Sequence, residues 1–153
     1  MARVDPAGPP SPYGRRVVVR VETPRGAFVK RDWVDGRLRV AFVSPFPCPF
    51  DYGHVPGEPA ADGLGRDAVW LGPSRRPLET PEGVVVAVVR FTDGGVEDDK
   101  WVVDPHAALA ARDAARLERF FRFYAWTKRL RGVDARFGGI ETAPATPGGR
   151  PSR

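Results

Sequence analysis

The feature that most constrains this chain is a series of short apolar runs separated by glycine and proline. The longest aliphatic run, 84–89, is far too short to span a bilayer and predicts a buried strand. Strands are expected at 16–22, 28–33, 37–43, 68–71, 84–91 and 100–103. Asp35-Gly36 lies between the second and third of these runs and predicts a hairpin turn. The first half of the chain is therefore expected to be rich in β-structure.

One long helix is predicted after the last of these strands. Asp104-Pro105 is typical of a helix start, with aspartate as the N-cap, and the helix is expected to run to about 131. Four side chains share one face at helical spacing: Leu117, Phe121, Tyr124 and Lys128. Tyr124 and Lys128 are thus expected to reach the same pocket. Three phenylalanines are expected in the core: Phe120, Phe121 and Phe123.

The length of 153 residues suits a single domain, and 42% hydrophobic residues suffice for an ordinary core. Residues 1–14 and 138–153 have little apolar periodicity and predict flexible tails on a domain at 15–137. The single cysteine, Cys48, excludes an intrachain disulfide. No N-terminal basic segment precedes a long apolar stretch, so we expect a cytoplasmic protein without a membrane segment.

The formal net charge of +5 and the pI near 10.0 come mostly from arginine. This charge favours anionic partners, either phosphates or nucleic acid. A barrel that binds single-stranded nucleic acid through aromatic and arginine side chains is one alternative. The tryptophans are instead expected among core elements, at Trp33, Trp70, Trp101 and Trp126. Nucleic acid is therefore not the expected partner.

Two acidic clusters, at 62–67 and 93–100, carry the strongest functional signal. Mg²⁺ prefers oxygen ligands in near-octahedral geometry, which carboxylates on separate loops supply well. The candidate ligands are Asp62, Asp67, Asp93 and Asp98. Lys100 lies beside the second cluster and would hold a phosphate group next to the metal. The clusters together predict a magnesium and phosphate site.

Histidine and cysteine do not provide a competing metal site. His54 follows the Tyr52-Gly53 turn, and His106 lies at the predicted helix start. Neither histidine has zinc-ligand spacing with Cys48. A zinc site is therefore not expected.

Over about 17–131 the chain resembles the family I soluble inorganic pyrophosphatases, magnesium-dependent enzymes that hydrolyse diphosphate to two phosphates. That family has a pocket glutamate two residues before a proline, then a lysine and an acidic residue, which correspond to Glu22, Lys30 and Asp32. The other matching segments are 44–53 (a proline-rich stretch ending in Tyr-Gly), 62–67 and 93–100 (the two metal loops) and 120–124 (a late helix with a tyrosine).

The resemblance implies an α+β fold with a small, mainly antiparallel five-stranded β-barrel, OB-like and of pyrophosphatase type, flanked by helices. It implies homo-oligomers, Mg²⁺ as cofactor, and diphosphate or another phosphoanhydride as substrate. The implied metal ligands are Glu22, Asp62, Asp67, Asp93 and Asp98. The implied catalytic residues are Asp62, Asp67 and Tyr52. The expected substrate contacts are Lys30, Asp32, Arg39, Tyr52, Lys100, Tyr124 and Lys128.

Three positions depart from the family pattern. Leu64 replaces the middle aspartate, which in the family helps to activate the attacking water, and leucine cannot take a proton. Val40 replaces an arginine, although Arg39 is adjacent, and Ala125 replaces the lysine after the helix tyrosine. Lys128, one helical turn after that tyrosine, is the best substitute for the lost lysine.

Two main hypotheses follow. The first is magnesium-dependent hydrolysis of inorganic diphosphate or a related phosphoanhydride by metal-activated water, weakened or altered by Leu64. A general base contributes about 100- to 10,000-fold, whereas the cation itself lowers the pKa of water, so losing one aspartate need not abolish hydrolysis. The second is a non-catalytic pyrophosphatase-like protein that binds metal and phosphate, or a protein partner.

Overall fold

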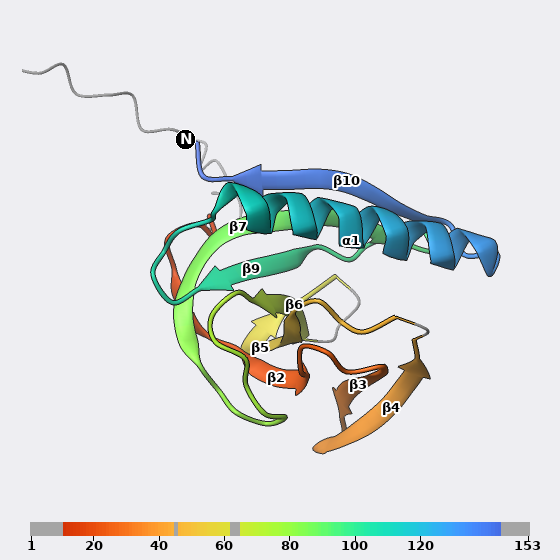
Figure 1. The fold of residues 1–153 in the computed structure, drawn as a ribbon, viewed down its shortest axis with the longest axis horizontal. Helices are drawn as coiled ribbons and strands as arrows, with labels where there is room; N and C mark the ends of the chain where they lie inside the picture. Colours follow the sequence, from red (N-terminus) through yellow and green to blue (C-terminus); the bar gives the residue numbers. More distant parts are fainter. Residues whose placement is uncertain (1–10, 45, 62–64, 145–153) are drawn as a thin grey trace, which may run out of the picture.

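The computed structural model describes residues 11–44, 46–61 and 65–144 (Figure 1). Ten strands and one helix occur in this part of the chain. The strands are β1 (Arg16–Val18), β2 (Arg20–Thr23), β3 (Val29–Val34), β4 (Arg37–Val43), β5 (Asp51–Pro59), β6 (Gly65–Trp70), β7 (Glu82–Asp93), β8 (Val96–Glu97), β9 (Lys100–Asp104) and β10 (Ala135–Thr142). The helix is α1 (Ala111–Leu130).

The larger sheet has eight strands, with the order β1-β7-β9-β6-β5-β2 and with β8 and β10 both paired to β7. All its pairs are antiparallel except β6 with β9. The two ends of this order, β1 and β2, are separated in the chain only by Val19, so the sheet curls around its core. No strand pairing closes it among the described residues. A curled sheet of eight strands therefore replaces the predicted five-stranded barrel.

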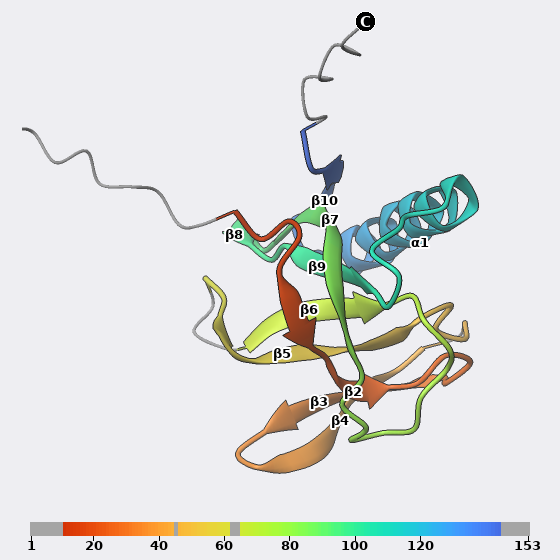
Figure 2. The same cartoon turned by 90° about the vertical axis from the view of Figure 1, so that its left-hand side faces the viewer.

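The hairpin of β3 and β4 forms a separate two-stranded sheet, at the opposite end of the molecule from α1 and β10 (Figure 2). Its turn is Asp35-Gly36, as the sequence predicts, and both residues have positive φ, at 50° and 73°. A two-residue turn with two positive φ values matches the right-handed twist of the flanking strands, and aspartate and glycine tolerate that conformation. The hairpin carries Lys30 and Asp32.

The helix differs from its prediction at its start. It begins at Ala111, because Asp104 caps a preceding turn instead: its Oδ2 accepts hydrogen bonds from the backbone N–H groups of His106 at 2.7 Å and Ala108 at 3.2 Å. The described residues contain this one helix rather than several flanking helices. It is not long and apolar enough to cross a membrane.

The predicted tails are shorter than expected where the structure describes them. Residues 138–142 belong to β10, which pairs with β7 from Ala135↔Asp93 to Thr142↔Ala87, so assigning them to a C-terminal tail was wrong. Near the other end, the Gly14 N–H donates to the Val85 carbonyl at 2.9 Å, and Tyr13 packs against a buried cluster. These segments contain glycine and few apolar residues, so their hydrophobic periodicity was too weak to predict strands.

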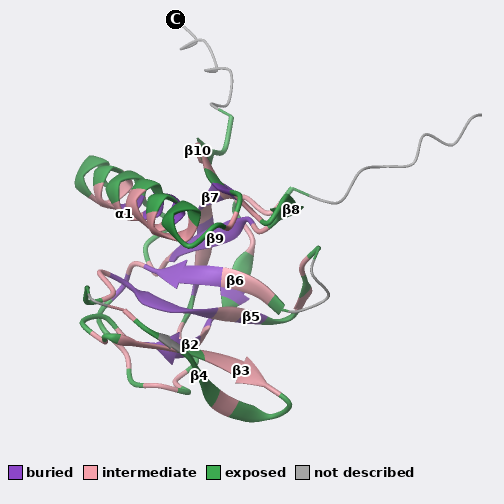
Figure 3. Ribbon diagram, turned by 90° about the vertical axis from the view of Figure 1, so that its right-hand side faces the viewer, coloured by how far each residue is buried: buried purple, intermediate pink, exposed green. Residues whose placement is uncertain are grey.

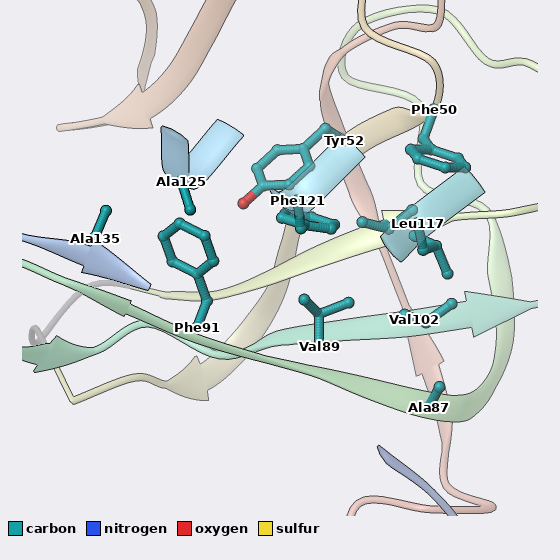
Figure 4. Close-up of a cluster of buried hydrophobic side chains, with 11 residues drawn as sticks. Phe50, Tyr52, Ala87, Val89, Phe91, Val102, Leu117, Phe121, Ala125 and Ala135 are labelled. Carbon is teal, nitrogen blue, oxygen red and sulfur yellow. The ribbon is translucent and has the colours of Figure 1, made fainter. Parts of the chain in front are cut away.

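The core lies inside the curled sheet and beneath α1. Leu117, Phe121 and Ala125 form the buried face of the helix and pack on Val89 and Val102 of the sheet (Figure 4). Buried residues are concentrated along β5, β6, β7 and β9, whereas the outer face of α1 is exposed (Figure 3). The helix face predicted from Leu117 and Phe121 is thus the docking face. Tyr124 and Lys128 continue this side of the helix and line a pocket beside the acidic residues.

Candidate functional site

Lys100 is the centre of the acidic site. It begins β9, which runs parallel to β6, and this pairing places it beside Asp67. Its side chain is 2% exposed, and its Nζ lies 2.7 Å from Asp67 Oδ2 and 2.6 Å from Asp98 Oδ2. The ammonium group therefore bridges carboxylates from both acidic clusters of the sequence.

Tyr52 and Lys30 extend this group from two other strands. Tyr52 lies on β5, which pairs with β6, and its hydroxyl donates to Asp67 Oδ2 at 2.9 Å. Lys30 lies on β3, with its Nζ 5.4 Å from the centroid of the Tyr52 ring and 3.7 Å from Asp32 Oδ1. Two of the predicted substrate contacts from the first half of the chain, Tyr52 and Lys30, thus lie near Asp67 of the first acidic cluster.

The helix supplies Tyr124 and Lys128. Lys128 Nζ forms an ion pair with Asp93 at the end of β7 and lies 5.0 Å from the centroid of the Tyr124 ring. Both side chains line the same pocket as Lys30 and Tyr52. The shared face predicted from helical spacing is confirmed.

The turn between β7 and β8 brings the second acidic cluster together. Gly94 and Gly95 have φ values of 61° and 80°, which permit a tight turn directly after Asp93. The chain returns so that the Asp98 N–H donates to the Phe91 carbonyl at 2.9 Å. The neighbouring Asp99 is 5% exposed and is used structurally, since it accepts from Phe91 N–H and Arg90.

The carboxylates at the centre have opposite pKa shifts. Burial alone would raise the pKa of Asp67, but the charge and hydrogen bond of Lys100, together with Lys30 and Tyr52, lower it. Burial raises the pKa of Asp98, and the attraction of Lys100 only partly offsets that effect. Asp67 is therefore the more strongly stabilised anion of the pair.

The pKa values of Tyr52, Lys30 and Lys128 are all raised. Burial raises the pKa of Tyr52 well above its ordinary value, and the charge of Asp67 adds to the shift. Burial disfavours the charged forms of Lys30 and Lys128, but Tyr124 and nearby carboxylates raise the pKa of both. At neutral pH the Tyr52 phenol is therefore a neutral donor beside the ammonium groups of Lys30 and Lys128.

Several predicted site residues lie away from the pocket or outside the residues that the structure describes. Glu22 is 5% exposed and accepts a hydrogen bond from the Trp33 N–H at 2.6 Å, while its other oxygen lies 2.7 Å from His54 Nδ1. Arg39 lies on exposed β4 opposite Asp32 and does not line the pocket. Asp62 and Leu64 lie outside the described residues. No local pattern predicts the Glu22–His54 pair, because the two residues lie on separate strands, β2 and β5.

The donor chemistry of the acidic site suits magnesium. Carboxylate oxygens are the ligands that this cation prefers. Among the described residues, however, no three histidine, cysteine or acidic side chains are gathered as a metal site. Lys100 and Lys128 instead hold the aspartates. Magnesium would therefore have to take over positions now held by ammonium groups.

A pocket of about 600 Å³ adjoins this charged group. Lys30, Tyr52, Tyr124 and Lys128 line it, and most of the remaining lining is apolar, including Phe28, Phe46, Phe120, Phe123 and Pro47. Of the three phenylalanines predicted as core, only Phe121 is buried, whereas Phe120 and Phe123 face this pocket from partly exposed positions. Helical periodicity shows which side chains share a face of the helix. It does not show which of them pack against the sheet and which line the pocket.

The fold of this chain matches the folds of solved family I inorganic pyrophosphatases, and the predicted resemblance is confirmed at the level of fold. The inorganic pyrophosphatase of Coxiella burnetii matches with a TM-score of 0.72 and 23% identity, over 85% of this chain and 89% of that one. The enzyme of Helicobacter pylori matches with a TM-score of 0.74 and 21% identity, over 86% and 87%.

The inorganic pyrophosphatase of Thermus thermophilus gives a similar result, with a TM-score of 0.71 and 22% identity over 90% of this chain and 87% of that one. No protein-family model and no curated protein sequence matches the chain. At such identities the likeness establishes the fold, and chemistry has to be argued from the site.

Proposed function

We propose that this protein binds phosphoanhydrides at the Lys100 site and hydrolyses them with magnesium, inorganic diphosphate or a related compound being the substrate. The convergence of lysines, tyrosines and aspartates from five strands and one helix at one end of a pocket supports this function most strongly. The pyrophosphatase fold is consistent with it.

The side chains suit the binding and orientation of phosphoryl groups. Lys30 and Lys128 would neutralise the phosphate charge, and Tyr52 and Tyr124 would donate hydroxyl hydrogens to phosphoryl oxygens. Positioning and charge stabilisation of this kind dominate phosphoryl transfer. The raised pKa values of Lys30 and Tyr52 keep both groups in their donating forms near neutral pH.

Magnesium would be held by Asp67, Asp93 and Asp98, together with Asp62. When bound, it would supply charge stabilisation at the phosphoryl oxygens and a lowered pKa of water. A phosphate group arriving at the site would attract Lys100 and Lys128 away from the aspartates, which frees carboxylate oxygens for the cation. Substrate and metal are therefore expected to bind cooperatively.

A second candidate function is binding without turnover. It is favoured by Leu64, which has no carboxylate, and by Lys100, which pairs with both Asp67 and Asp98. In this case the protein would capture diphosphate or magnesium diphosphate, or act through a protein partner, and release no phosphate.

Phosphate release from diphosphate with magnesium distinguishes the two. The wild type would be measured beside Asp67→Ala, Leu64→Asp and a control, Asp134→Ala, whose exposed carboxylate pairs with Arg136. Hydrolysis predicts wild-type turnover that Asp67→Ala abolishes and Asp134→Ala leaves unchanged. Turnover seen only in Leu64→Asp would overturn enzymatic activity in favour of binding.

A further inference from the structure

The pocket beside the Lys100 site is larger and more apolar than inorganic diphosphate requires. Its volume of about 600 Å³ lies within the range of roughly 300–1,000 Å³ that is usual for sites of organic ligands. Diphosphate is small, charged on every side and strongly hydrated. It would occupy only the end of the pocket formed by Lys30, Tyr52, Tyr124 and Lys128.

The rest of the pocket is lined largely by apolar side chains, several of them aromatic and two of those strongly exposed. Phe28 and Phe46 are 52% and 54% exposed, although large apolar side chains are normally buried. Phe46 lies edge to face with Phe123, with the ring centroids 4.9 Å apart. Phe120 stacks on Tyr124, one of the proposed phosphate donors, at 6.0 Å. This aromatic wall thus includes both exposed rings and a ring that stacks on a residue of the phosphate end.

The charges around the wall indicate which end of a ligand lies where. Lys30 and Lys128 lie at the inner end, beside the aspartates. Arg116 and Arg119 of α1 and Arg131 at its C-cap also line the pocket, and Arg116 is fixed by a hydrogen bond to the Pro49 carbonyl at 3.1 Å. Thr23, Ser44 and Thr127 add neutral hydroxyl groups to the lining. A ligand with an anionic head and an apolar body matches this distribution.

Resting on the function proposed above, we propose that the substrate class of this site is a diphosphate monoester of an apolar organic group. The diphosphate would bind among Lys30, Lys128 and the tyrosines, and the organic group would lie against Phe46 and Phe123. Water attacks the terminal phosphorus, the bond from that phosphorus to the bridging oxygen breaks, and its electron pair leaves with the organic phosphate. The products are an organic monophosphate, inorganic phosphate and one proton.

The test compares three ligands on the full-length protein. They are geranyl diphosphate, whose body is aliphatic, ADP, whose body is aromatic and polar, and inorganic diphosphate. Binding is measured by calorimetry with calcium in place of magnesium, and turnover by phosphate release with magnesium. The proposal predicts that geranyl diphosphate binds at least about tenfold more tightly than inorganic diphosphate, since one apolar group in a fitting pocket contributes about 10- to 200-fold. Tighter binding of ADP than of geranyl diphosphate would overturn the apolar assignment.

Alanine variants of the aromatic lining test whether this pocket causes the preference for geranyl diphosphate. Phe46→Ala and Phe123→Ala should each lower the preference for geranyl over inorganic diphosphate about tenfold. Leu130→Ala, an exposed apolar position on the same helix but outside the pocket, should leave the preference unchanged. If instead the phenylalanine variants dissociate an oligomer, seen by sedimentation, without changing the preference, the pocket is an interface between copies and the proposal fails.

The result also separates this inference from the proposed hydrolysis. Phenylalanine-dependent binding of geranyl diphosphate without phosphate release from any ligand would uphold the ligand class and reject the enzyme. Phosphate release from inorganic diphosphate, combined with no preference for the organic compound, would uphold the enzyme and reject the ligand class.

Discussion

Lys100 Nζ lies 2.6 Å from Asp98 Oδ2, and the lysine side chain is only 2% exposed. The same ammonium group lies 2.7 Å from Asp67 Oδ2, so a single buried cation joins carboxylates that are far apart in the sequence. It stands where a divalent cation would otherwise neutralise the pair. The stability of this protein and its affinity for magnesium are therefore expected to be linked through Lys100.

Replacing Lys100 by methionine tests this link. Without the ammonium, two partly exposed carboxylates, 31% and 20% accessible, face each other. The loss in the free energy of unfolding should therefore lie at the lower end of the roughly 3–5 kcal/mol that is typical of a broken buried ion pair. Magnesium should then restore part of the loss, because it binds the folded state in place of the lysine. Thermal unfolding with EDTA and with millimolar magnesium measures both effects.

The matched control for Lys100→Met is Arg16→Met, because the Arg16–Glu82 pair is exposed, with side chains 66% and 54% accessible. Loss of an exposed pair should change stability by less than about 1 kcal/mol and should not alter the response to magnesium. An equal magnesium response in the wild type and in Lys100→Met would contradict the link.

Tyr52→Phe is expected to change how stability depends on pH in alkaline solution. Since burial and Asp67 raise the folded pKa of Tyr52 well above 10.0, the folded state binds the phenolic proton more tightly than the unfolded state. This contribution is fully present below pH 10 and is lost as pH rises toward the folded pKa, by about 1.4 kcal/mol per pH unit. Urea unfolding from pH 8 to 11 should therefore show a shallower alkaline decline in Tyr52→Phe. Parallel declines would show that Tyr52 does not hold its proton in this way.

Leu117→Ala should weaken the attachment of the helix to the sheet. Leu117 is fully buried against the sheet, and truncating a buried leucine typically costs about 2–5 kcal/mol through lost burial and a cavity. Leu130→Ala provides the same chemical change on the same helix at a position 68% exposed, where less than about 0.5 kcal/mol is expected. Equilibrium urea unfolding of the two variants gives the difference. Similar losses in both would indicate that α1 is docked by another face.

The parts of the fold that the sequence could predict were those with local signals. The Asp35-Gly36 turn and the apolar runs of β3, β4, β7 and β9 follow from short-range chemistry. β5 escaped prediction because it lies in a proline- and glycine-punctuated stretch, yet the β5 pairing with β6 extends from Asp51↔Trp70 to Pro59↔Gly65. Long-range pairing stabilises such a strand, and that pairing leaves no periodic trace in the sequence.

Several residues that lie together at the candidate site, among them Lys30, Tyr52, Tyr124 and Lys128, were named from helical spacing and from the family resemblance. The partners of those residues were not predictable. These contacts depend on how distant strands and the helix pack. They include the Lys100 contacts with Asp67 and Asp98, the Lys128–Asp93 pair and the Phe46–Phe123 contact. Sequence patterns indicated the chemistry, and tertiary packing determined which charges neutralise one another.

Gly53→Ala is predicted to disrupt the pairing of β2 with β5. A Cβ at Gly53 would lie 1.9 Å from the Arg20 carbonyl oxygen, and the obstacle is backbone, so the two strands would have to separate. Overpacking usually costs about 1–3 kcal/mol, and a clash with backbone should reach or exceed the upper end of that range. Because Tyr52 is the adjacent residue, the change should also displace its hydroxyl from Asp67.

Gly138→Ala is the comparison for this variant, because the added Cβ would meet Arg90 Cβ at 3.1 Å rather than a carbonyl oxygen at 1.9 Å. Its effect should stay within about 1 kcal/mol, since alanine also restricts the unfolded chain. Urea midpoints give the stabilities, and diphosphate affinity reports the position of Tyr52. Wild-type stability in Gly53→Ala would contradict the close approach of β2 and β5. A large loss of stability in both variants would show instead that the sheet tolerates no added methyl group at either edge of the site.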